Sequence, residues 1–387
     1  MRALTRIGAV SAASIALVGA FGSAAQAATP SASAVAAHAS FSAHGSSSGA
    51  VFVETDSTVG NAVVAYRRAA DGTLTQSGRY ATGGVGGVLG GSVVDHTASE
   101  GAVARSEGDL LTVNAGSDTV TSFRVDGDRL ARVSSVSSGG DFPVSIATRG
   151  AYVFVLNARD GGSVQGYLNL GGRLVALPGS HRALGLDPAA TPEFTTTPAQ
   201  VSFTPDGSHL VVSTKGNTSA FEVFGVRGLL GLSAKPVTTT VAGAVPFGFT
   251  FDARGRIVAT EAGPNAVATF AVQPSGAVTP VSQTLTGQAA TCWIVEADGR
   301  FYASNAGSGT LSTIAETASG QVSVQATTAT DAGTVDAAAT PDGRYVYAQT
   351  GATGTLDEFR VGADGSLVRI GSVVVPDAVG GEGIVAE

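Results

Sequence analysis

The chain has 387 residues, of which 43% are hydrophobic and only 13% are charged, and its formal net charge is −8. This length exceeds what one compact core usually organises, so several domains or a repeat array are expected. The acidic charge argues against nucleic acid and anionic membrane surfaces as partners. Zinc-ligand motifs and phosphate-cradling loops are absent from the sequence, so we expect no cofactor and no metal.

Residues 1–27 have the pattern of a secretory signal peptide. Arg2 and Arg6 precede an apolar run, and the small residues Ala25 and Ala27 follow it at the positions that signal peptidase requires. A membrane anchor is the alternative, but the run is too short to span a bilayer comfortably and no second long apolar segment follows. We therefore predict a secreted, extracellular protein without membrane insertion.

The rest of the chain has the pattern of a repeat of short strands. Residues 28–48 are rich in Ala and Ser without periodicity, which predicts a disordered leader before a folded domain at 49–387. The clearest unit is Pro198 to Leu230, where apolar runs alternate with a tight turn at 204–207 and a polar turn. A meander this short cannot bury its own face, so it has to stack against copies of itself.

The glycine turn that closes this unit occurs seven times, and the strand before each turn carries one large residue. The spacing is about 45 residues, except where insertions near 83–99 and 180–197 lengthen it. Four strands in a unit of this length are typical of a propeller blade. The seven large residues are Tyr66, Phe123, Tyr167, Phe224, Phe270, Ile314 and Phe359.

These features predict an all-β fold, a seven-bladed β-propeller of four-stranded blades. The first blade, which starts near Ala50, lacks an inner strand, and the chain ends in a lone strand pattern at 380–387. We expect the C-terminal strand to complete the first blade, since this closure removes a free sheet edge.

In a propeller blade, the first strand begins and the second strand ends at the same mouth of the central channel. Lys215 and Glu261 end second strands, where no turn requires a charge, although the two could also pair across the channel. Phe247 and Trp293 begin first strands. Together they predict a site for a small polar ligand with an apolar wall and a few converging polar groups.

Further strand ends add weaker candidates. Asn114, Asn157 and Asn305 end second strands and either bind the ligand or satisfy the backbone of the adjoining turns. Glu100 begins a first strand and would form a carboxylate pair with Glu261 for acid–base chemistry if both point inward.

The chain contains the motifs LLTVNAGSDTVTSFRV (110–125), PAQVSFTPDG (198–207), VPFGFTFD (245–252) and QAATCWIVEADGRFYASNAGSGTLS (288–312). These motifs resemble the lactonase-type seven-bladed propeller family, which includes 6-phosphogluconolactonases and carboxymuconate-lactonising enzymes. The resemblance covers about residues 50–387. Within that family, the chain is similar to a secreted actinobacterial branch often labelled 3-carboxymuconate cyclase.

The resemblance implies one site residue and two departures. Glu261 matches a glutamate of the family, whereas Gln200 stands where enzymatic members tend to carry His. Phe247 and Gly248 stand where such members tend to carry Arg and His. Without the arginine, a carboxylate or phosphate on a substrate would lose its bidentate anchor.

Two functions are therefore expected. The first is a secreted lactonase-like enzyme that hydrolyses or forms a lactone of a small polar substrate at the channel mouth. Glu261 would be its acid–base group, Lys215 its anion anchor and Trp293 a stacking wall. The second is a non-catalytic extracellular propeller that binds a ligand or a protein, which the departures favour, because propellers serve many functions. We expect a monomer in either case.

Overall fold

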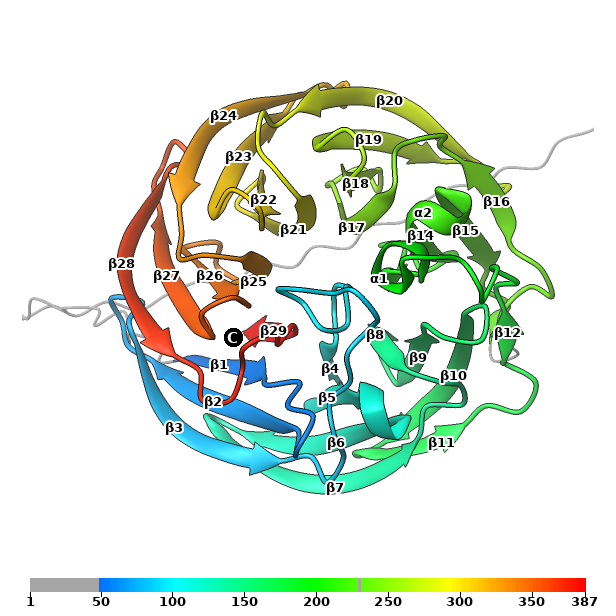
Figure 1. The fold of residues 1–387 in the computed structure, drawn as a ribbon, viewed down its shortest axis with the longest axis horizontal. Coiled ribbons are helices and arrows are strands. Elements are labelled where there is room, and N and C mark those ends of the chain that lie inside the picture. The colour runs from blue at the N-terminus through cyan, green and yellow to red at the C-terminus, as the bar shows by residue number, and fades with distance from the viewer. Residues whose placement is uncertain (1–48, 229–230) are drawn as a thin grey trace, which may run out of the picture. The chain divides into compact units, whose positions relative to one another are not determined.

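The computed structural model describes residues 49–228 and 231–387, which form a ring of antiparallel sheets around a central channel (Figure 1). The predicted seven-bladed propeller is confirmed: each blade has four strands, and the third has one additional short strand. The predicted signal peptide (1–27) and leader (28–48) lie outside the described residues. No helix within the described part of the chain is long and apolar enough to cross a membrane.

The strands of each blade run from the channel outwards. Blade 1 has β29 (Ile384–Ala386), β1 (Gly49–Glu54), β2 (Ala62–Arg68) and β3 (Leu74–Ala81). Blade 2 has β4 (Val103–Ser106), β5 (Asp109–Asn114), the 3-10 turn η1 (Ala115–Ser117), β6 (Thr119–Asp126) and β7 (Arg129–Ser137). Blade 3 has β8 (Pro143–Arg149), β9 (Tyr152–Asn157), β10 (Ser163–Leu170) and β11 (Arg173–Ala176), with β12 (Arg182–Ala183) also paired to β10.

The remaining blades follow the same order. Blade 4 has β13 (Gln200–Phe203), β14 (His209–Thr214), β15 (Ala220–Gly225) and β16 (Val237–Thr240), with the short helices α1 (Glu193–Thr196) before it and α2 (Lys215–Thr218) within it. Blade 5 has β17 (Pro246–Phe251), β18 (Ile257–Glu261), β19 (Ala266–Val272) and β20 (Val278–Leu285). Blade 6 has β21 (Thr291–Ala297), β22 (Arg300–Asn305), β23 (Thr310–Glu316) and β24 (Val322–Ala329). Blade 7 has β25 (Thr334–Ala339), β26 (Tyr345–Thr350), β27 (Thr355–Val361) and β28 (Leu367–Val374).

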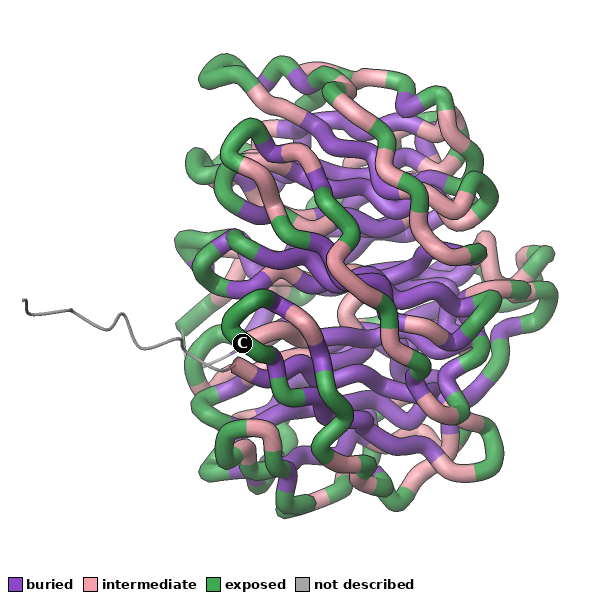
Figure 2. Tube along the Cα trace, turned by 90° about the vertical axis from the view of Figure 1, so that its left-hand side faces the viewer, coloured by how far each residue is buried: buried purple, intermediate pink, exposed green. Residues whose placement is uncertain are grey.

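The core lies between neighbouring blades. The seven large residues predicted from the repeat all lie on third strands and are at most 2% exposed. Two of them also bond to the preceding blade: Tyr66 Oη donates to the carbonyl of Val374 (2.9 Å), and Tyr167 Oη to that of Ser137 (2.6 Å). Each such side chain contributes on the order of 2 kcal/mol by leaving water. Figure 2 shows the result, with buried strands inside and exposed turns at the rims.

Closure of the ring occurs as predicted. β29 pairs antiparallel with β1, so that Ile384 lies opposite Val53 and Ala386 opposite Val51. The C-terminal strand thereby becomes the innermost strand of blade 1 and covers the inner edge of β1.

At one end of the ring, which we call the turn end, first strands turn tightly into second strands. In the turn at 204–208, Asp206 Oδ1 accepts hydrogen bonds from Thr204 Oγ1 (2.7 Å) and Ser208 N (3.0 Å). Asp342 fixes the corresponding turn of blade 7 in the same way. The aspartates stabilise these turns because a short carboxylate side chain satisfies nearby backbone donors.

Candidate functional site

The other end of the channel is closed by residues 83–101, which we call the plug. This segment joins blade 1 to blade 2 and lies across the centre of the ring (Figure 1). Its backbone bonds to well-separated parts of the chain: Gly86 N donates to Ser57 O (2.8 Å), His96 N to Gly380 O (2.8 Å), and Glu100 N to Ala199 O (3.2 Å). The first predicted insertion therefore covers the mouth where the candidate residues were expected.

The second insertion supports the plug from the side. Glu193 of α1 accepts a hydrogen bond from Gly90 N (2.6 Å) through Oε2, while its Oε1 pairs with Arg159 Nε (2.7 Å). Arg159 also donates to the carbonyl of Val88 in the plug (3.3 Å). These contacts hold the exposed part of the plug against blades 3 and 4.

A buried carboxylate shapes the inner part of the plug. Asp95 Oδ1 accepts from Thr97 N (2.8 Å), and Asp95 Oδ2 accepts from Ser99 N (2.9 Å). The loop so formed presents two carbonyl groups to the blades. The carbonyl of Ala98 accepts from Lys215 Nζ, and that of Ser99 accepts from Trp293 Nε1, both at 2.6 Å.

Lys215 follows β14 and is 1% exposed. Its ammonium lies 5.3 Å from the centre of the Phe247 ring, which in turn packs edge-on against Trp293 at 5.0 Å. Burial lowers the pKa of Lys215 to about 7, although the nearby Asp95 carboxylate opposes this shift. A lysine with this pKa changes its protonation state near neutral pH, whereas an exposed lysine stays protonated there.

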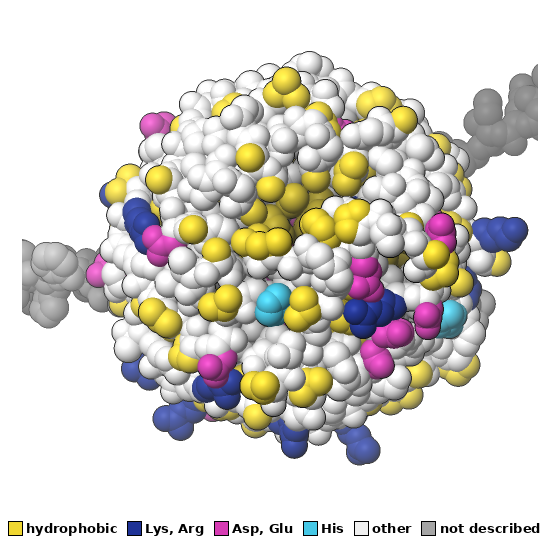
Figure 3. All heavy atoms as spheres, in the orientation of Figure 1, with side chains coloured by type: hydrophobic (Ala, Val, Ile, Leu, Met, Phe, Trp, Pro, Cys, Tyr) yellow, Lys and Arg dark blue, Asp and Glu magenta, His cyan; other side chains and the backbone are white. Residues whose placement is uncertain are grey.

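Apolar side chains surround this group. Phe247 and Trp293 form one cluster with the buried Ala199 and Val335, and Val94, Cys292 and Ala306 pack against it while partly exposed. Figure 3 shows hydrophobic side chains gathered around a hollow near the centre of this face, close to where Figure 1 labels β17 and β21. The apolar wall expected from Phe247 and Trp293 therefore exists, with Lys215 beside it.

Glu100 approaches the same cluster from the end of the plug. Its Oε2 accepts from the backbone N–H of Ile294 (3.2 Å) and lies against Gly248, where an added Cβ would stand only 1.7 Å away. Burial, reinforced by the nearby Asp336, raises the pKa of Glu100 well above its usual value. Burial therefore favours the protonated form of the Glu100 carboxyl group.

Gln200 and Glu261 have other partners. Gln200 Oε1 accepts from Phe249 N (2.5 Å) and so ties β13 to β17. The carboxylate of Glu261 accepts from the side-chain amide of Gln283 on β20, the outermost strand of its blade. Burial raises the pKa of Glu261. The proposed pairing of Glu100 with Glu261 is not a direct contact, and the acid–base role of Glu261 stays a prediction.

The three asparagines make structural contacts. Asn114 donates to Thr119 Oγ1 (3.0 Å) and Thr121 Oγ1 (3.1 Å), and Asn305 accepts from Thr291 Oγ1 (2.6 Å). Asn157 donates to the carbonyl of Ser138 (3.3 Å). All three are fully buried, and a role for them in ligand binding stays a prediction.

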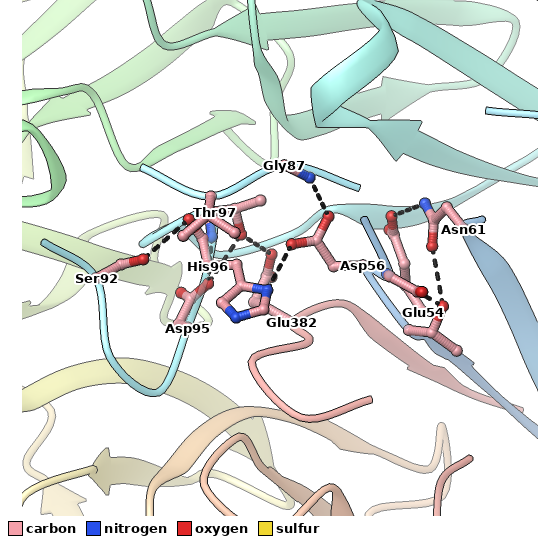
Figure 4. Close-up of polar contacts among 12 residues, drawn as sticks. Glu54, Asp56, Asn61, Gly87, Ser92, Asp95, His96, Thr97 and Glu382 are labelled. Atoms are coloured by element: carbon pink, nitrogen blue, oxygen red, sulfur yellow. Dashed lines mark hydrogen bonds and ion pairs between the residues drawn. The ribbon is translucent and has the colours of Figure 1, made fainter. Parts of the chain in front are cut away.

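A cluster of buried carboxyl groups lies beneath the plug (Figure 4). Glu382 accepts from Gly101 N (2.7 Å) and Ser99 Oγ (3.1 Å), and Glu54 accepts from Asn61 Nδ2 and Thr112 Oγ1, both at 2.6 Å. Burial raises the pKa of Glu54 to about 8, and also raises that of Glu382. In the described part of the chain, no group of three or more acidic, His or Cys side chains has the geometry to hold a metal ion.

Sequence reasoning missed this cluster, although a signal for it was present. Glu54 ends the second strand of blade 1, the position that Lys215 and Glu261 hold in their blades. The repeat pattern does not indicate this position, because blade 1 takes its first strand from the other end of the chain. Asp95 and Asp56 lie in or beside irregular segments, where no periodicity indicates their direction.

Comparison with solved structures identifies similar propellers. A periplasmic gluconolactonase from Pseudomonas aeruginosa is 21% identical, with a TM-score of 0.68 over 88% of this chain and 99% of the other. A provisionally assigned 6-phosphogluconolactonase from Bacteroides fragilis is 17% identical, with a TM-score of 0.68 over 88% and 98%. A virginiamycin B lyase from Staphylococcus aureus is 11% identical, with a TM-score of 0.52 over 74% and 88%.

No family model matches the sequence, and no curated protein matches it either. At these identities the likeness concerns the fold, and the same fold carries lactonases and a lyase. The chain has the fold of the 6-phosphogluconolactonase-like seven-bladed propellers.

Proposed function

We propose that this protein is an exported lactonase that hydrolyses a small polar lactone in the hollow beside the plug. The observation that carries the proposal is that Lys215 and Glu100 both approach one apolar cluster, where burial lowers the pKa of Lys215 to about 7 and raises that of Glu100. Perturbed groups beside an apolar hollow are typical of catalytic sites. The names of the similar propellers support the same reaction class.

The two groups have complementary protonation states. The neutral amine of Lys215 accepts a proton from a water molecule as the water oxygen attacks the lactone carbonyl carbon. The ring C–O bond then breaks, and Glu100 gives its proton to the departing ring oxygen. The product is a hydroxy acid, and transfer of the proton from Lys215 back to Glu100 through water restores both groups. Lys215 acts here as a base, in place of the anion-anchor role expected from the sequence.

The test is turnover of a lactone panel at pH 7 by the wild-type protein and by Lys215→Met. Loss of a general base lowers kcat/KM by about 100-fold or more. Lys235→Met is the matched control, because Lys235 is exposed and should retain wild-type activity. Glu261→Gln in the same assay tests the acid–base role predicted for Glu261. Equal turnover in Lys215→Met and wild type would overturn the assignment of Lys215.

A non-catalytic binding propeller is the second candidate. One observation favours it: the plug already occupies the N–H groups of Lys215 and Trp293 with its own carbonyls. This candidate predicts no turnover of any lactone, together with saturable binding of a small molecule that Trp293 fluorescence would report. Turnover that co-purifies with the protein and is lost in Lys215→Met would exclude it.

Export and the monomeric state belong to the same proposal. They are tested by expressing the full chain in a secreting host and recovering it from the medium. Mass spectrometry should show a mature chain that begins at residue 28, and light scattering should give the mass of one chain. Retention of residues 1–27 in the recovered protein would refute the cleavage site.

A further inference from the structure

Acidic groups outnumber basic groups around the hollow. Lys215 is the basic group that touches its wall, while the acidic side chains of Glu100, Asp336 and Asp95 lie in electrostatic reach of the site. Burial, and after it the neighbouring Asp336, raises the pKa of Glu100, so a negative charge is disfavoured at this position. A substrate that brings a further negative charge meets repulsion in a medium with little water to screen it.

Arginine is not available to offset such a charge. In residues 49–228 and 231–387, no arginine hydrogen-bonds to or stacks on Lys215, Phe247, Trp293 or Glu100. Arg159 contacts the plug through the carbonyl of Val88, but its guanidinium pairs with Glu193 at 2.7 Å and lies 4.2 Å from the centre of the Phe142 ring. A carboxylate or phosphate would find no bidentate donor.

The side-chain nitrogen of Lys215 also has partners within the protein. It donates to the carbonyl of Ala98 at 2.6 Å and faces an aromatic ring. The remaining wall offers carbon and sulfur from Phe247, Cys292 and Ala306. Such a surface stabilises an uncharged molecule with an apolar portion, because that portion leaves water without losing a charge–water interaction.

We propose that the site accepts uncharged lactones that carry an apolar substituent and rejects lactones that carry a carboxylate or a phosphate. This inference rests on the proposed function for its reaction, but it concerns selectivity and has its own measurement. It separates this chain from the phosphorylated substrate named for the Bacteroides fragilis propeller.

The experiment compares three δ-lactones with the same ring: one with a butyl chain, one with a carboxypropyl chain and one with a phosphooxypropyl chain. Hydrolysis is followed by pH-stat titration at pH 7 and low salt. We expect kcat/KM for the butyl compound to exceed that for either anion by about tenfold or more. Equal or higher values for an anionic compound would overturn the inference while leaving the proposed function intact.

A charge added at the mouth should reverse the preference. Val94 is partly exposed and packs against the aromatic cluster, so Val94→Arg places a guanidinium at the hollow. Val93→Arg is the matched control, because Val93 is 80% exposed and adds the same charge on the adjacent residue. The ratio of anionic to neutral turnover should rise in Val94→Arg and stay near the wild-type ratio in Val93→Arg. An equal rise in both variants would contradict a local effect.

The two proposals can fail separately. If none of the three lactones is hydrolysed, the proposed function fails, and binding of the corresponding unreactive δ-lactams by thermal shift decides the inference. Stabilisation by the butyl lactam alone would support the charge selectivity. Stronger stabilisation by an anionic lactam, or no stabilisation by any of the three, would refute it.

Discussion

Aspartates in the exposed turns at one end of the ring and carboxyl groups at the plugged mouth have pKa values shifted in opposite directions. At the turn end, Asp71, Asp206 and Asp364 lie in exposed turns, where nearby hydroxyl and backbone N–H donors lower the pKa of each carboxyl. At the plugged mouth, burial raises the pKa of Glu54 to about 8 and that of Asp336 to about 7. Every blade contributes to both ends, so the difference comes from solvent and local donors.

The turn-end aspartates therefore have a structural role, whereas the carboxyl groups at the mouth have the pKa shifts that proton-transfer chemistry requires. A turn-end aspartate is charged, hydrated and bonded within its own turn, so it stabilises local geometry and has little reason to exchange a proton near pH 7. A carboxyl beneath the plug is held neutral at a cost in free energy that packing elsewhere has to offset. Surface cavities of about 490 and 410 Å³ lie among the turns, and burial raises the pKa of Glu316, which lines the second of them, to about 7. We place the site at the mouth because Lys215 and Glu100 approach one apolar cluster there.

The largest expected effect is the pH dependence of stability, which the mouth should dominate. Because the pKa of Glu54 is raised, the folded state binds more protons than the unfolded state between pH 4.5 and 8. The free energy of unfolding should fall as pH rises through this window, by about 3 kcal/mol or more. Lys215, whose pKa is lowered to about 7, opposes this trend above pH 7.

Urea denaturation at pH 5 and at pH 8 measures this slope. Glu54→Gln keeps the size of the side chain and removes the titration, so its slope should be clearly shallower than that of the wild type. Glu107→Gln is the control, because Glu107 is exposed. If the wild-type protein is more stable at pH 8 than at pH 5, the buried carboxyl groups do not determine the pH dependence of its stability.

Gly248→Ala should disturb the mouth almost as strongly. The new methyl group would stand 1.7 Å from Glu100 Oε2 and 2.8 Å from the carbonyl oxygen of Cys292. We expect a loss of about 1–3 kcal/mol in stability and a fall in turnover, because the Glu100 carboxyl is displaced. Gly60→Ala is the control, since no heavy atom lies within 4 Å of its added methyl group.

A double variant identifies the source of that effect. Glu100→Ala removes the atom that the new methyl group meets, so the stability loss in Gly248→Ala/Glu100→Ala should be smaller than the sum of the two single losses. Strictly additive losses would mean that Gly248 and Glu100 do not interact.

Asp95→Asn should loosen the plug without unfolding the blades. The amide keeps one of the two acceptor oxygens that bind Thr97 N and Ser99 N, so about 1–2 kcal/mol of local stability should be lost. Hydrogen exchange should become faster in the plug and stay unchanged in the strands of blade 6. Uniformly faster exchange throughout the ring would instead indicate global destabilisation.

The smallest effect is expected at the turn end. Asp206→Asn should cost about 0.5 kcal/mol or less at pH 7, because the turn is exposed. The pKa of Asp206 is lowered to about 2 by Ser208 N and the neighbouring hydroxyl groups. The difference in free energy of unfolding between the wild type and Asp206→Asn should therefore be present above pH 4 and disappear as pH falls towards 2. A turnover change in Asp206→Asn would contradict the separation of the two ends.

The blades could be predicted because their signals repeat. Tyr66 and Phe359 lie almost 300 residues apart, yet the same position in the repeat predicts their burial, and the structure confirms it. The glycine-rich turns and the closing strand 384–386 were equally predictable, because free sheet edges and unpartnered sheet faces are unfavourable.

The mouth could be predicted only in part. Position in the blade correctly brought Lys215, Phe247 and Trp293 together, but it did not show that Glu261 turns to Gln283. That direction depends on a partner in another strand. The path of the plug was also beyond prediction, because Asp95 and Glu382 place it through contacts that leave no periodicity in the sequence.

The contact of Glu382 with the plug can form only after the C-terminal end of the chain has been synthesised. The Glu382 carboxylate accepts a hydrogen bond from Gly101 N, a partner 281 residues earlier in the chain. During synthesis the plug therefore leaves the ribosome long before the residue that fastens it, and a nascent chain has neither a closed ring nor a finished mouth.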